Sequence, residues 1–165
     1  MTRSSPAGLT VQYFVTGDIR ALLLPLPSGP GRANELWRHT CFEIFLRKPA
    51  DDAYCEFNFA PSLQWAAYRF DGYRCGMRDL EIPPPRVSIR QDGTSLELRA
   101  ALALDGLMDP DVETKWNLAL SAVIEETNGN ISHWALAHSP GKPDFHHRDA
   151  FMAPLSRVAE IPLRA

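Results

Sequence analysis

The sequence predicts an all-β protein: an antiparallel β-sandwich of about ten strands, built as a single domain over residues 1–165. Fourteen prolines and ten glycines divide the chain into short apolar segments, which favours strands over long helices. Several segments alternate apolar and polar side chains, the period of a strand with one face on a hydrophobic core. Asp71-Gly72, Asp92-Gly93 and Asn128-Gly129 indicate hairpin turns, because these residue pairs tolerate positive φ.

The individual strands are predicted from these short apolar runs and the turn residues between them. They are 9–15, 19–25, 40–47, 54–60, 64–70, 86–91, 95–104, 116–125, 131–138 and 156–162. Two segments predict short helical turns. One is 109–113, where a capping Asp109 precedes Pro110, and the other is 144–152. No internal repeat or linker is visible, so we expect one domain.

Three of these segments predict a surface that is suited to a ligand. In 40–47, 54–60 and 116–125, large apolar side chains alternate with small or polar ones. The polar set includes Glu43, Glu56, Asn58 and Ser121. If the three segments are neighbours in a sheet, these side chains share one face and can hydrogen-bond a molecule above it.

Composition and charge exclude several classes of protein. The net charge is −3 and no basic cluster occurs, whereas nucleic-acid binding needs concentrated Lys and Arg. No apolar run approaches the roughly 20 residues of a membrane span. The first residues lack a secretory signal pattern. The odd number of cysteines (Cys41, Cys55 and Cys75) indicates free thiols in a reducing compartment, so we expect a cytoplasmic protein.

Four tryptophans divide into two kinds. Trp37 follows a Pro- and Gly-rich loop and immediately precedes a predicted strand. It either stacks on a ligand or caps one end of the core, and its place in the sequence leaves both interpretations open. Trp116 and Trp134 share strand faces with leucines and are predicted to lie in the core, while Trp65 is compatible with either place.

Glu43 and Glu56 raise the question of catalysis. Two carboxyl groups on adjacent strands could act as acid and base, as in glycoside hydrolysis. The alternative is that they accept hydrogen bonds from ligand hydroxyls, and we favour it because no G-x-S-x-G, phosphate-binding glycine loop, dinucleotide fingerprint or H-E-x-x-H occurs. The sequence therefore indicates a binding protein rather than an enzyme.

Several motifs together resemble a known family. Trp37, followed six residues later by Glu43-Ile44-Phe45-Leu46, resembles the signature of family 9 carbohydrate-binding modules and of the wider DOMON superfamily. CEFNF, SLELRAAL, WNLALSAVIEE and ISHWALA follow in the order of those modules. WRHTCFEIFL, YCEFNFAPS, WAAYRFDGYR and ALAHSPGKPDFHH are similar to small bacterial DOMON-like proteins of unassigned function. The resemblance covers roughly residues 8 to 163.

The resemblance implies a non-enzymatic domain that binds a small molecule, a saccharide or sugar derivative. In the carbohydrate-binding relatives two tryptophans sandwich a sugar ring; Trp37 matches the first, and Phe145 or His146 would replace the second. Asn58 stands where those modules carry an arginine, which implies a different sugar. Arg69 and Lys142 would allow an anionic group on it. The ligand-binding residues predicted in this way are Trp37, His39, Glu43, Glu56, Asn58, Arg69, His138, Lys142, Phe145 and His146.

The loop from His138 to His147 and the resemblance leave alternatives open. Some DOMON proteins bind haem, for which Met77, His39, His138 and His146 are the candidate ligands. His138, Asp144 and His147 could hold a metal ion, but their spacing matches no established metal motif. We therefore expect neither cofactor nor metal, with a haem- or metal-binding redox module as the alternative. A sugar-acting enzyme and an interaction domain with a vestigial pocket are further alternatives.

Overall fold

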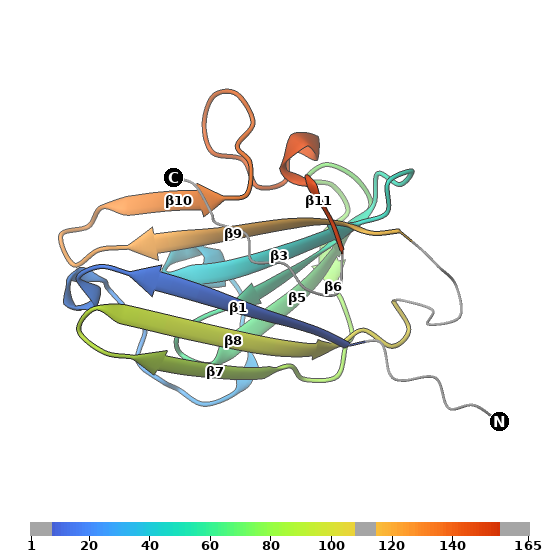
Figure 1. The fold of residues 1–165 in the computed structure, drawn as a ribbon. Coiled ribbons are helices and arrows are strands. Elements are labelled where there is room, and N and C mark those ends of the chain that lie inside the picture. Colours follow the sequence, from blue (N-terminus) through green and yellow to red (C-terminus); the bar gives the residue numbers. More distant parts are fainter. Residues whose placement is uncertain (1–7, 108–114, 156–165) are drawn as a thin grey trace.

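The computed structural model describes residues 8–107 and 115–155 as a β-sandwich, which confirms the predicted fold class (Figure 1). Within these ranges the chain forms eleven strands and three 3-10 turns. In chain order the elements are β1 Gly8–Thr16, η1 Ile19–Ala21, β2 Gly31–Arg32, η2 Leu36–Arg38, β3 Cys41–Arg47, β4 Tyr54–Phe59, β5 Gln64–Phe70, β6 Arg78–Asp79, β7 Arg86–Gln91, β8 Ser95–Ala103, β9 Asn117–Glu125, β10 Ile131–Ala135, η3 Arg148–Ala150 and β11 Ala153–Pro154.

The strands form two sheets of unequal size. The larger sheet has the order β10-β9-β3-β4-β5-β2, with β11 paired to β9 and β6 paired to β5. The smaller sheet has the order β1-β8-β7 and packs face to face against the larger one (Figure 1). Every pair is antiparallel except the short β2–β5 pair, which is parallel. The predicted neighbours β3, β4 and β9 are adjacent, with β3 in the middle.

The main hydrophobic core fills the space between the two sheets. Phe42, Ile44 and Phe57 of the larger sheet are fully buried, and so is Leu98 of the smaller sheet. Tyr13 of β1 ties the layers together, because its hydroxyl donates to the backbone oxygen of Glu43 at 2.6 Å. The alternation read from the sequence thus assigns the inward-facing side chains of these strands correctly.

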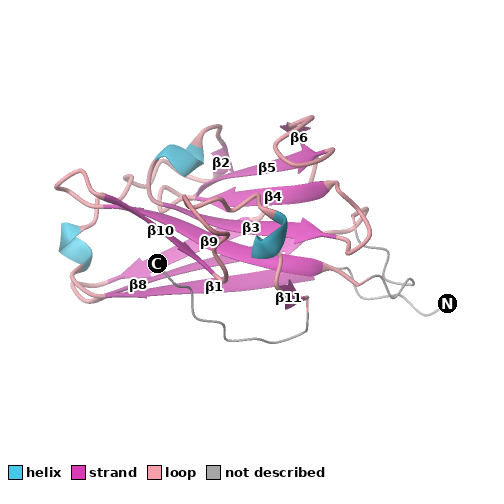
Figure 2. Ribbon diagram, turned by 90° about the horizontal axis from the view of Figure 1, so that it is seen from above, coloured by secondary structure: helices cyan, strands magenta, loops and turns pink. Residues whose placement is uncertain are grey.

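The opposite face of the larger sheet carries a second apolar cluster. Its buried members are Phe45, Tyr54, Ala66, Tyr68, Phe70, Ala119, Ala150 and Phe151. Leu36 of η2 and Phe145 of the loop after β10 pack against it, so η2 and the segment around η3 cover this outer face (Figure 2). The sequence predicted that each strand has one polar face. In β3 and β4 the outer face does carry the polar side chains Glu43, Glu56 and Asn58, but every residue of these two strands is buried.

Most predicted strands are confirmed, and the exceptions have local causes. The predicted strand 19–25 does not form: the segment begins as the 3-10 turn η1, where the Asp18 side chain accepts a hydrogen bond from the backbone N–H of Arg20, and only Leu22 makes an isolated bridge, to Glu126. Strand 131–138 ends at Ala135. The 144–152 turn is confirmed as η3, whereas 109–113 and 156–162 lie outside the described residues. The turns at 92–93 and 128–129 join β7 to β8 and β9 to β10, while 71–72 leads toward β6.

The tryptophans follow their places in the sheets. Trp65 lies in the main core and Trp116 packs against it. Trp134 was predicted to lie in the core but is 38% exposed, because β10 is an edge strand of the larger sheet. Its Nε1 donates to the Ser132 hydroxyl at 3.0 Å. Trp37 is 36% exposed and is therefore not a core residue.

Two further predictions were that the cysteines are free thiols and that the chain has no membrane span. The three cysteines are free thiols; Cys41 and Cys55 are buried, whereas Cys75 is exposed. Among the residues that the structure describes, no helix has both the length and the apolar character needed to cross a membrane.

We predict that Phe57→Ala lowers the free energy of unfolding by about 3–5 kcal/mol, because the ring is fully buried between the sheets. Phe14→Ala is the matched control: this ring is 70% exposed on β1, so the change stays within about 0.5 kcal/mol. Urea unfolding of both variants measures the difference. Equal effects of the two substitutions would contradict the assignment of the core.

Candidate functional site

Four polar side chains form the floor of the candidate site on the outer face of the larger sheet. Glu43 of β3 lies directly opposite Asn58 of β4 on one side and Ser121 of β9 on the other. Glu56, two residues before Asn58 on the same strand, shares its face. All four are buried, with exposed fractions of 4% or less. The predicted polar surface therefore exists, but it is covered.

Hydrogen bonds satisfy most of the floor and leave one acceptor without a partner. Ser121 Oγ donates to Glu43 Oε2 at 3.0 Å, and Asn58 Nδ2 donates to Glu56 Oε1 at 2.8 Å. The remaining amide oxygen, Asn58 Oδ1, is buried and has no hydrogen-bond partner in the described part of the chain. Such an atom in a protein interior costs free energy unless a ligand or water pairs with it.

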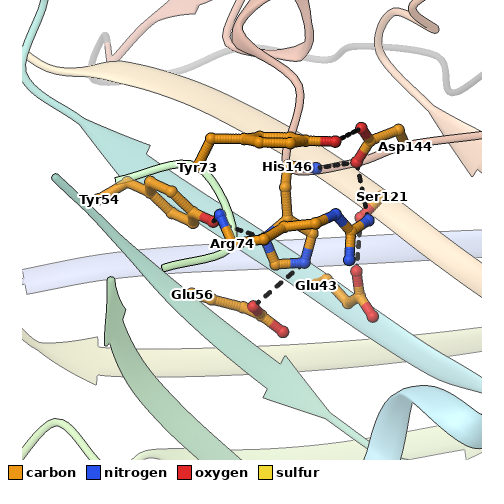
Figure 3. A network of polar contacts seen from close by, with 8 residues as sticks. All are labelled: Glu43, Tyr54, Glu56, Tyr73, Arg74, Ser121, Asp144 and His146. Atoms are coloured by element: carbon orange, nitrogen blue, oxygen red, sulfur yellow. Dashed lines mark hydrogen bonds and ion pairs between the residues drawn. The ribbon is translucent and has the colours of Figure 1, made fainter. Parts of the chain in front are cut away.

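Two loops bring a second group of side chains over the floor (Figure 3). His146 comes from the loop after β10; its Nε2 lies 3.7 Å from Glu56 Oε2, and its Nδ1 is hydrogen-bonded to the Tyr54 hydroxyl at 2.7 Å. The same hydroxyl accepts the backbone N–H of Arg74 at 3.2 Å. The Arg74 guanidinium in turn donates to Asp144 at 2.8 Å. The bonds from Tyr54 and Asp144 thus connect the loop after β5 with the loop after β10.

Arg74 has an unusual backbone conformation for its residue type. Its φ is 50°, in the left-handed region that residues with a Cβ seldom adopt. The hydrogen bonds from its backbone to Tyr54 and from its guanidinium to Asp144 hold it there. Figure 3 shows the result, with the Arg74 side chain lying above Glu43 and Glu56.

We call Arg74 and His146, which lie over the floor, the cover. Burial changes the pKa values of the floor carboxyl groups and of His146. It raises the pKa of Glu43 to about 8, with the charge of Glu56 as a further cause and the Ser121 hydrogen bond opposing. It raises the pKa of Glu56 to about 7 against the opposing effects of Asn58 and Arg74. It lowers the pKa of His146 to about 4, and the Arg74 charge adds to this. The imidazole is therefore neutral at pH 7, and both carboxyl groups keep much of their proton.

An aromatic rim lies beside the floor. The Trp37 ring packs edge-on against Tyr68, with the ring centroids 5.9 Å apart. Tyr68 lies directly opposite Glu56 on β5, and its hydroxyl donates to Asn34 Oδ1 at 3.0 Å. Trp37 is therefore one side chain away from the buried carboxyl groups and still reaches the surface.

The structure brings half of the predicted ligand-binding residues together. Trp37, Glu43, Glu56, Asn58 and His146 lie around one floor. Phe145 covers the same apolar cluster, and its ring lies 6.5 Å from that of His138 and 5.9 Å from that of His133, next to the floor rather than on it.

Three predicted residues lie elsewhere. Arg69 points to the inner side of the larger sheet, because on β5 it alternates with Tyr68 and pairs with the inward-facing Cys55. His39 is bonded to Glu125 at the end of β9 at 2.7 Å, and Lys142 is exposed in its loop. The expectation that Arg69 joins the floor is corrected by this geometry.

The candidate metal and haem ligands are dispersed. Within residues 8–107 and 115–155, no group of three or more His, Cys, Asp and Glu side chains is placed to hold a metal ion. Asp144 is engaged by Tyr73 and Arg74, and His147 lies 3.6 Å from Asp149. Met77 is half-exposed on the connection that leads to β6.

Sequence reasoning missed Tyr54, Tyr68 and Arg74. Tyr54 alternates with Glu56 and Asn58, so the period of the strand could have assigned it to the floor. Tyr68 has the same period on β5. Arg74 had no such signal, because its position depends on a left-handed turn and on a contact with a loop 70 residues away.

The fold is shared with a known structure. It matches the crystal structure of a protein from Bacteroides uniformis described provisionally as carbohydrate-binding, with a TM-score of 0.66 and 13% sequence identity. The match covers 88% of this chain and 72% of that chain, and at this identity it shows the fold alone. No protein-family model matches the chain, and the search of curated proteins finds no relative.

We predict that the free energy of unfolding falls as the pH rises from about 6.5 to about 8. A carboxyl group whose pKa is raised by folding stabilises the protein below its unfolded pKa, and this is lost as the pH rises through the folded value. His146, whose pKa is lowered, acts in the opposite direction but only below pH 6.5. Each carboxyl group that stays protonated contributes a slope of up to about 1.4 kcal/mol per pH unit.

Urea unfolding at several pH values measures this slope. Glu43→Gln should make it shallower, whereas Glu81→Gln, at an exposed position, should leave it unchanged. A wild-type stability that is flat or rises over this interval would show that the two carboxyl groups are not protonated in the folded protein.

Proposed function

We propose that this protein is a non-enzymatic binding domain for a small polyhydroxylated molecule, a saccharide or sugar derivative, held at the Glu43–Glu56–Asn58 floor. The observation that carries the proposal is the unpaired and buried Asn58 Oδ1, on the residue that lies opposite Glu43 and is bonded to Glu56. Proteins rarely leave a buried acceptor without a donor. A ligand hydroxyl supplies such a donor.

The chemistry of the rim fits the same ligand class. A sugar ring has hydroxyl groups at its edge and C–H groups on its face. The floor offers acceptors for the hydroxyls, and Arg74 offers donors above it. Trp37 presents an indole that is partly exposed and supported by Tyr68, to which the C–H face can pack.

Two similarities support the saccharide class. The Bacteroides uniformis protein with this fold is described provisionally as carbohydrate-binding. The motifs around Trp37 and Glu43 resemble family 9 carbohydrate-binding modules and DOMON proteins. The structural neighbour and the motif resemblance thus support the same ligand class as the hydrogen-bonding groups of the floor and the indole of the rim.

The buried carboxyl pair favours a second candidate, an enzyme that acts on a sugar. Two carboxyl groups with raised pKa values on one face can divide the roles of acid and base. In that case turnover of a saccharide disappears in Glu43→Gln and in Glu56→Gln. Binding without turnover favours the non-enzymatic function.

We predict that titration calorimetry of the protein against a panel of mono- and disaccharides finds a ligand whose affinity depends on Trp37. Trp37→Ala should weaken its binding by about 1 kcal/mol or more, roughly fivefold in Kd, because the stacking contact is lost. Trp134→Ala is the matched control. Its indole is exposed to nearly the same extent, 38% against 36%, but on the edge strand β10.

A ligand whose affinity drops equally in both variants does not bind at this floor. If no saccharide binds the wild-type protein, the proposed function is wrong. Circular dichroism of the variants separates lost binding from lost folding.

A further inference from the structure

The polar atoms of the floor are unbalanced toward hydrogen-bond acceptors. Glu43 and Glu56 each contribute a carboxyl group, and each already accepts one bond from a neighbour within the floor. The Asn58 side chain donates one N–H to Glu56, and its Oδ1 has no hydrogen-bond partner among the described residues. Ser121 thus uses its hydroxyl donor and Asn58 one of its two N–H donors inside the floor. With both carboxyl groups ionised, the floor therefore presents mostly acceptors to a ligand.

The charges around the floor are also unbalanced. With both carboxyl groups ionised, Glu43, Glu56 and Asp144 carry three negative charges against one positive charge on Arg74. Arg74 is hydrogen-bonded to Asp144 rather than to either floor carboxyl. His146 is neutral at pH 7. The floor therefore attracts either protons or a cation.

We propose that the floor binds a primary ammonium group, which makes an amino sugar the class of saccharide that fits this site. The proposal rests on the function proposed above and narrows its ligand. An ammonium group has three N–H donors and no acceptor, which matches Glu43, Glu56 and Asn58 Oδ1. A neutral hydroxyl in the same place would offer a single donor to these three groups.

Aromatic rings beside the carboxyl groups favour the same charge. Phe45 and Tyr68 lie directly opposite Glu56 on the two neighbouring strands. Tyr54 lies two residues before Glu56 on the same face. Aromatic faces attract cations, and this attraction is stronger away from water.

The other titratable groups that face the carboxyl pair set the pH dependence. Cys41, Tyr54, Tyr68 and His146 are neutral at pH 7, since burial raises the pKa of the first three and lowers that of His146. Arg74 and Asp144 are charged and are bonded to each other. An ammonium group that binds here replaces the protons of Glu43 and Glu56, so binding releases protons to the buffer.

A ligand reaches the carboxyl groups only when the cover moves. Arg74 and His146 lie over the floor in Figure 3. The Arg74 side chain is 53% exposed and can rotate toward solvent. Because it is a cation, its presence opposes a bound ammonium group. Arg74→Ala should therefore tighten the binding of an amine and not that of a neutral sugar.

The test compares D-glucosamine, D-glucose and N-acetyl-D-glucosamine by titration calorimetry at pH 6.5. These sugars differ at one substituent: an ammonium, a hydroxyl and an uncharged amide. We expect glucosamine to bind at least tenfold more tightly than either of the others. Its apparent enthalpy should also change between phosphate and MES, buffers without a primary amine that differ in ionisation enthalpy, in the direction of proton release. The comparison uses wild-type protein alone, so it does not depend on how a variant folds.

Variants locate the preference. Glu43→Gln and Glu56→Gln should each reduce the preference for glucosamine over glucose at least fivefold and reduce proton release. Trp134→Ala should leave both unchanged. Equal affinity for glucosamine and glucose, or a preference that both glutamine variants keep, overturns the ammonium site.

Cyclohexylamine and cyclohexanol separate this inference from the proposed function. If no saccharide binds but cyclohexylamine binds more tightly than cyclohexanol in a manner that depends on Glu43, the ammonium site stands and the saccharide function fails. If glucose binds as well as glucosamine, the saccharide function stands and the ammonium site fails. If none of these compounds binds, both are wrong.

Discussion

Burial of two carboxyl groups on the outer face of the larger sheet is the constraint on which the site depends. A charged group without a partner is costly in a protein interior, and the cost is met by holding protons or by pairing with a ligand. The main core between the sheets needs neither Glu43 nor Glu56, since apolar side chains fill it. The acidic floor therefore opposes folding, which fits the binding function proposed above rather than a structural role.

The cover that produces this burial comes from distant parts of the chain. η2, the loop after β5 and the segment that contains η3 meet over β3 and β4, and side chains such as Leu36 and Phe151 seal the surface around the floor. The loop after β10 is joined by side-chain bonds to Tyr54 of β4 and to Arg74 of the loop after β5, rather than by strand pairing. These contacts can therefore break without breaking a strand pair, as the binding proposed above would require.

Much of the fold could be predicted from alternation and turn residues, and so could the shared face of Glu43, Glu56 and Asn58. Their burial could not, because it depends on the cover rather than on the strands. Arg69 was predicted to bind the same ligand because it is a hydrogen-bond donor. Adjacent residues of a strand point to opposite faces of the sheet, however, so Arg69 lies on the other face from Tyr68. Trp134 has the pattern of a core residue, yet its place on an edge strand exposes it. The place of a strand within the sheet and the segments that cover it are not encoded in the local alternation of side chains, so such features could not be predicted from it.

The protonation of the floor is the property that a single measurement tests most directly. NMR titration of the glutamate side-chain carboxyl carbons, with Glu43→Gln and Glu56→Gln to assign the two signals, follows each group through its own pKa. We expect both signals to titrate well above the ordinary glutamate range, near the values of about 8 and about 7 that their burial implies. Two signals that titrate near 4.5, the ordinary pKa of glutamate, would show that the carboxyl groups are solvated, and would contradict a buried acidic floor.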